Sequence, residues 1–387
     1  MISPELERLL EPLERFEAIR RRAARLGSRL ADLSYANPYE GPQTSAREAI
    51  RLTLEDERDL DLQYAPFGGQ TLSRRAAGDA LADSHGLPFA FTDVILTPGA
   101  MSALQLALRT AGDPGDEVVI PVPCWLDYPL YAQALGLVPR LVPLAGERFD
   151  LDVDTVSRAL SERTCAVILC HPANPTGRNY PADTLARLGD VLRRAEEELG
   201  RQVTLVADET HRDFVSPPDY TSGATSYDRC VIVYSFGKYH FMQGQRLGYV
   251  AVSPRHPARE AISEELVRWT RISGIATPTA LMQRALPRLL ALDHDLGWVE
   301  GWRGRLLEEL SGAGYVAAEP DATLFLYVQT PPDYQDDFSF VAELAAAGVL
   351  ALPAPVFHHA GWFRLSVTGS DEMLTKALPV LRKLVTA

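Results

Sequence analysis

The sequence is poor in cysteine, with four among its 387 residues. These four show neither a CxxC motif nor the Cys/His spacing of a metal site, and each lies in or beside an apolar run; they are Cys124, Cys165, Cys170 and Cys230. Such surroundings are typical of reduced, buried thiols in an intracellular protein. We therefore expect a cytoplasmic protein without a metal centre.

Positive charge and long apolar runs are also scarce. The formal net charge of −13 argues against a surface for nucleic acid or anionic lipid, because binding phosphates needs a basic field. No apolar stretch approaches the roughly 20 residues that span a bilayer, and the N-terminus, MISPELERLLEPLERF, is acidic and amphipathic, unlike a signal peptide. The basic cluster at residues 20–29 is expected to be the exposed face of a helix.

What is present is a globular composition in a chain longer than one core usually organises. Short, nearly continuous apolar runs alternate with helical patterns, which predicts a mainly parallel sheet covered by helices on both faces. These runs lie at residues 93–99, 116–123, 165–172, 203–209, 230–237 and 247–254. Long helices and short strands follow from about residue 255, with Ser370 as the expected N-cap of the last helix. We expect a large α/β domain at 46–280 and a smaller α+β domain built from 1–45 and 281–387.

Residues of types common in binding sites follow several of the predicted strands, at the edge of the sheet where ligands bind. Gly99 opens a helix whose N-terminus favours an anion, and the ring of Trp125 could stack on a flat ligand. Asn174 lies in the turn NPTG, and Asp208 follows a buried run, where a carboxylate needs a partner. Taken singly, each has an ordinary explanation as a turn former, a packing residue or half of an ion pair.

The segment SFGKYHFMQGQRLGY, residues 235–249, contains Lys238 just after a predicted strand. A lone lysine there is usually a solvated loop residue. A lysine desolvated near cations can instead lower its pKa and form a Schiff base, while Ser235, Arg246 and the helix start at Gly99 would hold a phosphate. With an acidic partner for a ring nitrogen and a stacking aromatic, these groups are the set expected for pyridoxal phosphate.

The order of these motifs resembles that of the class I/II aminotransferases, fold-type I pyridoxal-phosphate enzymes related to aspartate aminotransferase. The resemblance runs from SYANP at 34–38 to FRLSVTG at 363–369. In that family S-x-S-K, followed by G-x-R-hydrophobic-G-Y, carries the cofactor lysine. The resemblance therefore implies that Lys238 forms the Schiff base and that Ser235 and Arg246 bind the phosphate. The family's second serine is Gly237 here, which removes one hydroxyl contact.

The resemblance also implies roles for the remaining motifs. Asn174 is similar to the asparagine that bonds the cofactor's ring oxygen near the substrate carboxylate, and Asp208 to the partner of the ring nitrogen. Trp125 is similar to the stacking aromatic. The phosphate-binding helix start is matched by the backbone of Gly99, Ala100 and Met101.

Further residues are similar to the family's substrate and subunit contacts. Arg364 resembles the arginine that clamps the substrate α-carboxylate, and Asn37 in SYANP is a second candidate for substrate binding. Tyr64, and less clearly Thr277, resemble residues that reach the phosphate of the neighbouring subunit. The resemblance thus implies a homodimer with shared sites.

One position departs from the family pattern. The family usually has a tyrosine three residues after the aspartate, whereas DETHRDF places His211 there. An imidazole N–H could replace the hydroxyl, or His211 could act as an additional acid or base, since the pKa of histidine lies near neutrality. We expect His240, His358 and His359 to be bystanders.

The resemblance implies an aminotransferase that binds an amino acid, uses Lys238 to abstract the α-proton and releases a 2-oxo acid. The alternative is a pyridoxal-phosphate enzyme of side-chain chemistry: a lyase or an enzyme of replacement, cyclisation or oxidation. A regulatory protein is disfavoured because it would need a basic DNA-binding segment before SYANP. The amino acid stays open, with Arg271 a weak candidate for a contact near the partner's pocket.

Overall fold

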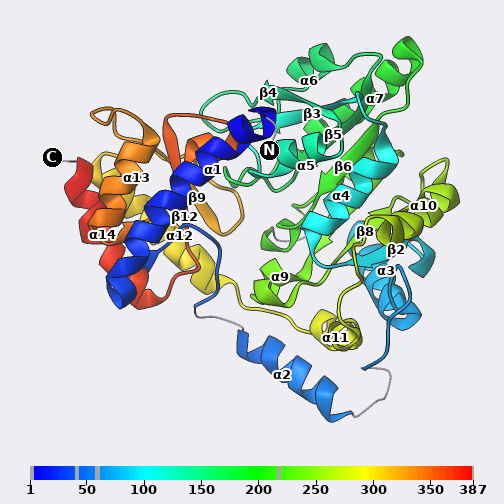
Figure 1. The fold of residues 1–387 in the computed structure, drawn as a ribbon, viewed down its shortest axis with the longest axis horizontal. Helices are drawn as coiled ribbons and strands as arrows, with labels where there is room; N and C mark the ends of the chain where they lie inside the picture. The colour runs from blue at the N-terminus through cyan, green and yellow to red at the C-terminus, as the bar shows by residue number, and fades with distance from the viewer. Residues whose placement is uncertain (1–3, 40–42, 57–61, 216–218, 386–387) are drawn as a thin grey trace.

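The computed structural model describes residues 4–39, 43–56, 62–215 and 219–385. Its largest element is a seven-stranded sheet in the order β2-β8-β7-β6-β5-β3-β4, in which neighbours are parallel except that β8 runs antiparallel to β2 and β7 (Figure 1). The strands are β2 (Val94–Thr97), β3 (Glu117–Val122), β4 (Val138–Pro143), β5 (Thr164–Cys170), β6 (Thr204–Asp208), β7 (Cys230–Ser235) and β8 (Gly248–Val252). The six predicted runs form all of these strands except β4.

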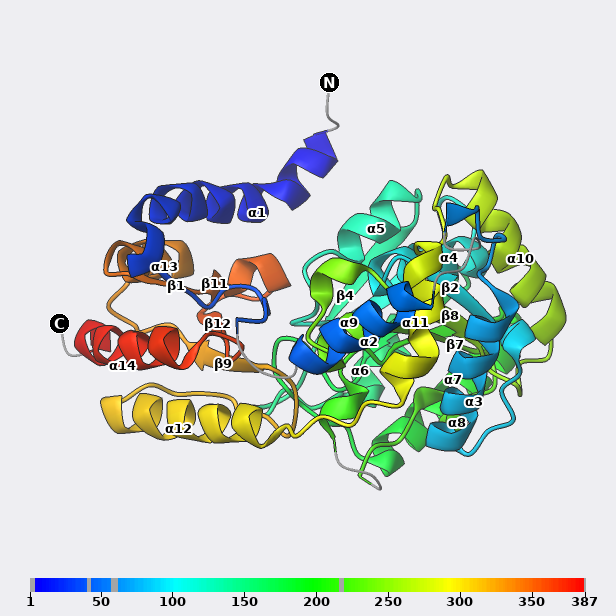
Figure 2. The ribbon, with the colours of Figure 1, turned by 90° about the horizontal axis from the view of Figure 1, so that it is seen from below.

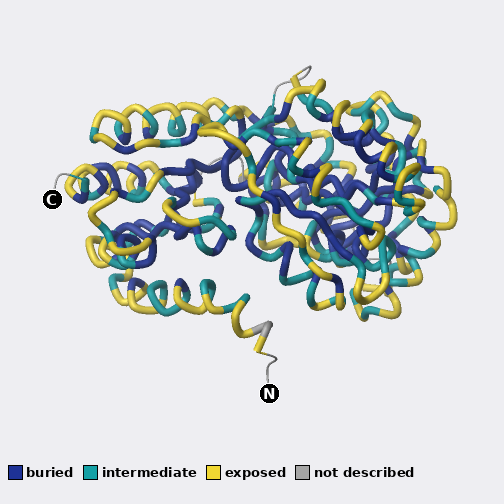
Figure 3. The backbone as a smooth tube through the Cα atoms, turned by 90° about the horizontal axis from the view of Figure 1, so that it is seen from above, coloured by how far each residue is buried: buried dark blue, intermediate teal, exposed yellow. Residues whose placement is uncertain are grey.

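Helices cover both faces of this sheet, as the continuous apolar runs predict. Along β3, Val118 and Ile120 pack in one apolar cluster with α4, α5 and α10, whereas Val119 packs in another with α3, α6, α7 and α11. Figure 3 shows the buried strands enclosed by helices whose outer faces are exposed. The helices are α2 (Gln43–Glu55), α3 (Thr71–His85), α4 (Ala100–Ala111), α5 (Tyr128–Ala134), α6 (Val153–Ala159), α7 (Ala182–Leu199), α8 (Gly223–Ser226), α9 (Phe236–Tyr239), α10 (Arg259–Ile272) and α11 (Ala280–Leu290), with 3-10 turns η3 (Phe91–Asp93), η4 (Arg212–Phe214) and η5 (Gln243–Gln245). We call this sheet and these helices the large part.

The small part combines both ends of the chain (Figure 2). Strand β1 pairs in parallel with β10, and β11, β12 and β9 form an antiparallel sheet. Its elements are α1 (Pro4–Ala23), η1 (Ala24–Arg29), β1 (Ala31–Asp32), α12 (Gly297–Ala313), β9 (Phe325–Gln329), α13 (Asp337–Ala346), β10 (Val349–Leu350), β11 (Leu352–Pro353), η6 (Ala354–Phe357), β12 (Trp362–Ser366) and α14 (Asp371–Val385). The fold class predicted from the sequence is confirmed.

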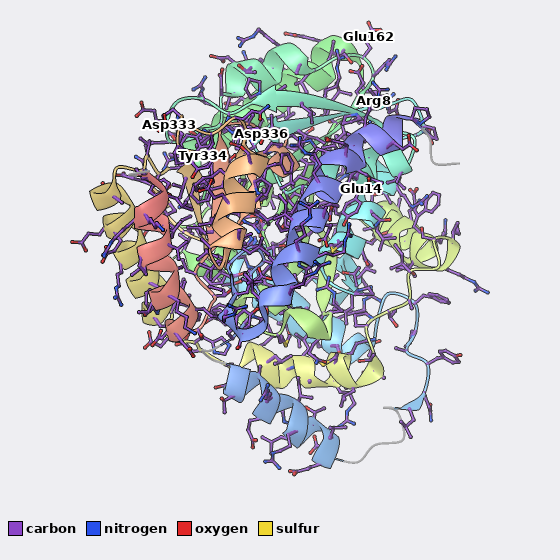
Figure 4. The ribbon with its side chains drawn as sticks, turned by 60° about the vertical axis from the view of Figure 1, so that its left-hand side comes forward. Arg8, Glu14, Glu162, Asp333, Tyr334 and Asp336 are labelled. Atoms are coloured by element: carbon purple, nitrogen blue, oxygen red, sulfur yellow. The ribbon has the colours of Figure 1, made fainter. Side chains whose placement is uncertain are left out.

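Side-chain contacts fix the first and last helices of the small part. Arg15 on α1 donates to Asp336 at 2.8 Å, and Figure 4 shows Asp336 with Asp333 and Tyr334 at the start of α13, beside α1. Ser370 accepts a bond from the backbone N–H of Met373 at 3.2 Å, which confirms it as the predicted N-cap of α14.

The predicted domain boundary at residue 281 falls at the start of helix α11. Its apolar face, which includes Met282, Leu286 and Leu289, packs in the core of the large part against α2 and α3. The turn of chain after α11 then leads to α12, which packs in the core of the small part. We therefore propose that the boundary lies between α11 and α12.

Among the described residues, no helix combines the length and the apolar character needed to cross a bilayer.

Candidate active site

A cavity of about 190 Å³ lies where β5, β6 and β7 end. The carboxyl ends of parallel strands share one edge of the sheet, so the residues that follow them converge there. Nine predicted site residues line the cavity: Ala100, Met101, Trp125, Asn174, Asp208, His211, Ser235, Lys238 and Arg246. Five further lining residues were not predicted: Leu104, Tyr128, Tyr131, Cys170 and Thr210.

Lys238 lies on α9, a helix of four residues directly after β7. Ser235 caps this helix by accepting a bond from the backbone N–H of Gly237 at 3.4 Å. Burial and, next in size, the positive charges of Arg364 and Arg246 lower the pKa of Lys238 to about 8, whereas Asp208 opposes the shift. A larger fraction of the amine is therefore unprotonated near neutral pH than for an exposed lysine, which makes it a competent nucleophile and base.

Asp208 ends β6 and is 8% exposed. One carboxylate oxygen accepts from the hydroxyl of Tyr128 at 2.5 Å and the other from the backbone N–H of Thr210 at 3.0 Å. Burial raises the pKa of Asp208, while the bonds from Thr210 and Tyr128 and the charge of Lys238 oppose this rise. The carboxylate is thus fixed in place and aimed at the cavity, suited to a cationic ring nitrogen.

The space between the N-terminus of α4 and the side chain of Arg246, called the cradle below, has room for an anion because residue 99 is glycine. Gly99 has φ +83°, and a Cβ atom there would lie 2.5 Å from Nη2 of Arg246. Arg246 itself adopts the left-handed region at φ +41°, which is uncommon for a side chain of its size. The guanidinium therefore lies against the N-terminus of α4, where free N–H groups and the helix dipole favour a phosphate.

Arg364 joins the small part to this site. It is completely buried on β12, and it donates from Nη1 to Oδ1 of Asn174 and from Nη2 to the carbonyl of Ser34, both at 2.8 Å. Its Nε is buried without a partner, and the rings of Phe325 and Phe357 lie 3.9 and 4.9 Å from its central carbon. Burial lowers the pKa of Arg364 to about 9, so the charge would be stabilised by a carboxylate bound next to Asn174.

His211 is 2% exposed, and its buried Nδ1 has no hydrogen-bond partner among the described residues. Its ring lies 5.6 Å from that of Phe325. Burial lowers its pKa well below the usual 6.5, and the charges of Lys238 and Arg364 act in the same direction. The imidazole, which lines the cavity, is therefore neutral at physiological pH.

Three other predicted site residues lie elsewhere. Tyr64 and Asn37 are exposed, Thr277 is half-buried, and none of the three is among the residues that line the cavity. The roles of Tyr64 and Thr277 at the site of a neighbouring subunit, and of Asn37 in substrate binding, stay predictions.

The remaining histidines singled out in the sequence have other partners. His240 is bonded to the ring of His294, His358 to the carbonyl of Leu126 and His359 to the hydroxyl of Tyr327.

The residues of the cavity fit pyridoxal phosphate. The phosphate would lie in the cradle that a Cβ at Gly99 would fill, the ring nitrogen would face Asp208, and the imidazole of His211 lines the same cavity. Lys238 would supply the amine that attaches the cofactor. Tyr128, which holds Asp208, is the first residue of α5 and lies three residues after Trp125, and this proximity to a predicted site residue was the available sequence signal.

Comparisons with known proteins agree with this geometry. Residues 30–381 match the model of the family described as aminotransferase class I and II. The chain is 30% identical over 363 residues to a probable aspartate/prephenate aminotransferase of Thermus aquaticus, covering 92% of this chain and 91% of that protein. It is 29% identical over 368 residues to the aspartate/prephenate aminotransferase of Thermus thermophilus, covering 92% and 90%.

The structure resembles the crystal structure of an aminotransferase from Eubacterium rectale. The TM-score is 0.89 with 26% sequence identity, covering 100% of this chain and 99% of that one. These relatives favour aminotransfer over the alternative side-chain chemistry. The chain therefore belongs to the aminotransferase class I and II family and is a pyridoxal-phosphate-dependent aminotransferase.

Proposed function

We propose that this enzyme transfers the amino group of an amino acid to a 2-oxo acid at the cavity around Lys238. The observation that carries the assignment of residues is the convergence of Asp208, from the end of β6, with Lys238 and Arg246, from the segment 235–249, on one cavity. The lowered pKa of Lys238 suits an attached cofactor, the bond that holds Asp208 suits a ring nitrogen, and the position of Arg246 beside Gly99 suits a phosphate.

The chain's own groups would divide the chemistry as follows. Arg364, held by Asn174, binds the substrate α-carboxylate and so turns the Cα–H bond toward Lys238. Lys238 would hold the cofactor through its amine, and the free Nζ would take the proton from that Cα, which its lowered pKa permits near neutral pH. The bound cofactor supplies the electron sink that stabilises negative charge at the α-carbon. Neutral His211 donates or accepts one hydrogen bond at the cofactor ring and carries no charge.

Two classes of amino acid are candidates for the substrate. The Thermus relatives are named aspartate/prephenate aminotransferases, so aspartate is the first amino donor to test. A second candidate is an uncharged aromatic amino acid, because Met101, Trp125 and Tyr131 line the cavity with apolar surface.

The assignment is tested by the absorption of the bound cofactor, recorded alone and with a panel of amino acids, with products identified by mass. Conversion to pyridoxamine phosphate with release of a 2-oxo acid is expected and names the donor. Lys238→Ala should lose the lysine-bound absorption band and nearly all turnover. Lys376→Ala is the matched control, since that lysine is exposed on α14 and paired with Glu372. A fully active Lys238→Ala protein would refute the proposed site.

We also propose that the enzyme is a homodimer in the cytoplasm. Large apolar side chains that a monomer would leave in water gather before α3 and at the end of α10: Leu62, Tyr64, Leu72 and Ile272 are 95, 104, 74 and 69% exposed. Light scattering should give twice the mass of one chain, and Leu72→Asp should shift the equilibrium toward the monomer. A monomer at micromolar concentration would contradict this proposal. The cytoplasmic location stays a prediction from the cysteine usage.

A further inference from the structure

Side-chain bonds join the lysine-bearing helix α9 to the segment between α11 and α12. Nδ1 of His240 lies 2.9 Å from Nε2 of His294, both in buried rings. The hydroxyl of Tyr239 donates to Asp293 at 3.1 Å and accepts from the backbone N–H of His294 at 3.2 Å. The two residues that follow Lys238 are therefore both fastened to the same short stretch of chain.

That stretch connects the two parts of the molecule. It leaves α11, which packs in the core of the large part, and enters α12, which packs in the core of the small part. Figure 1 shows it passing beside α9 on its way to α12. A movement of the small part relative to the large part would therefore also move the residues to which α9 is bonded.

The next residue, Phe241, packs in the core of the small part. Its ring is 2% exposed and lies 5.1 Å from that of Trp298 on α12. Phe241 holds φ +50°, an outlier for a bulky residue, which persists only where surrounding contacts determine it. Tyr239, His240 and Phe241 thus bind one after another to the residues that lead into α12.

Helix α9 depends on such contacts for its position. A helix of four residues is far below the length at which helices are stable alone, so neighbouring groups must hold it. Its function also demands accuracy, because Lys238 comes from the large part whereas Arg364, which would bind the substrate, comes from the small part. A misplacement of about 1 Å between reacting groups can reduce a rate by up to roughly 100-fold.

We propose that His240 and His294 are positioning residues for Lys238, and that the bond between their rings sets the distance from Lys238 to a substrate held by Arg364. This inference rests on the proposed function of Lys238. The bond needs one ring as an unprotonated acceptor. Tyr239 and Asp293 are the titratable groups nearest the pair, burial lowers the pKa of His240 to about 3, and burial also lowers that of His294. The pair is therefore intact at physiological pH.

The test compares His240→Phe, His294→Phe, the double variant and His294→Gln, which can still donate and accept. The control is His256→Phe, another buried histidine, whose Nδ1 accepts a bond from the backbone of Ala258. Amide hydrogen exchange is followed in the full-length protein by mass spectrometry. Faster exchange is expected in peptides covering residues 236–242 and 291–297 when the bond is removed, with His294→Gln close to the original protein and no change there in the control.

Kinetics supply the second readout. Removal of the bond should lower kcat about fivefold, as for a neutral hydrogen bond of about 1 kcal/mol, with KM within about twofold and a larger isotope effect from α-deuterated substrate. The double variant should be no slower than either single variant, because all three remove the same bond. Unchanged exchange, additive losses or an equal loss in His256→Phe would overturn the proposal. The exchange result does not depend on the reaction, so the failure of Lys238 as the catalytic amine would be recognised separately.

Discussion

At the scale of single residues, His211 is where this chain departs from its family pattern. The structure places its neutral ring at the cavity with Nδ1 unpartnered, which favours a hydrogen-bonding role over acid–base catalysis. His211→Tyr should therefore keep aminotransfer as the reaction, and His211→Phe should lower kcat by about fivefold because one neutral bond is lost. Product analysis and kcat for both variants check this.

The pH profile separates the two roles of His211. Because burial keeps the pKa of its folded form well below 6.5, the imidazole does not titrate between pH 6 and 8, and the profiles of the original protein and His211→Phe should have the same shape in that range. A limb near pH 6.5 that disappears in His211→Phe would instead identify the histidine as an acid or base.

At the scale of elements, the sequence predicted strands that are buried on both faces and missed one that is not. The runs that became β5 and β7 are almost uninterrupted apolar stretches, whereas β4 carries the exposed residues Val138, Arg140 and Leu141 at the edge of the sheet. Its pattern is that of neither a buried nor an alternating strand. The boundary that we propose between α11 and α12 has no clear sequence signal for a similar reason, since apolar residues recur on both sides of it.

The same elements explain how much of the site was predictable. Residues directly after a buried strand, such as Asp208 and Ser235, could be placed because the ends of parallel strands meet. The bond from Arg364 to Asn174 joins β12 to the turn after β5, residues 190 positions apart, and no local pattern specifies it; only the family resemblance suggested that both serve the substrate. Tyr128 is inside a helix, so its bond to Asp208 follows from packing alone.

At the scale of the whole molecule, buried histidines make stability depend on pH. Of the eight histidines, seven have a lowered pKa with burial as the main cause: His171, His211, His240, His256, His294, His358 and His359. Below pH 6.5 the unfolded chain binds protons at these rings that the folded protein does not accept. The free energy of unfolding should therefore fall as the pH falls, by about 1.4 kcal/mol per pH unit for each such proton.

This fall should be measurable by calorimetry as a lower Tm at pH 5.5 than at pH 7.5. His171 offers a matched test: its pKa is lowered to about 4, its ring is stacked between Tyr180 and Tyr220, and its Nδ1 accepts from the backbone of Tyr180. His171→Asn keeps an acceptor and removes the titration, so it should lower Tm at both pH values while reducing the difference between them. A Tm that is flat or higher at pH 5.5 would mean that the buried carboxyl groups, such as Asp208 with its raised pKa, outweigh the histidines, because those groups bind protons more readily in the folded state.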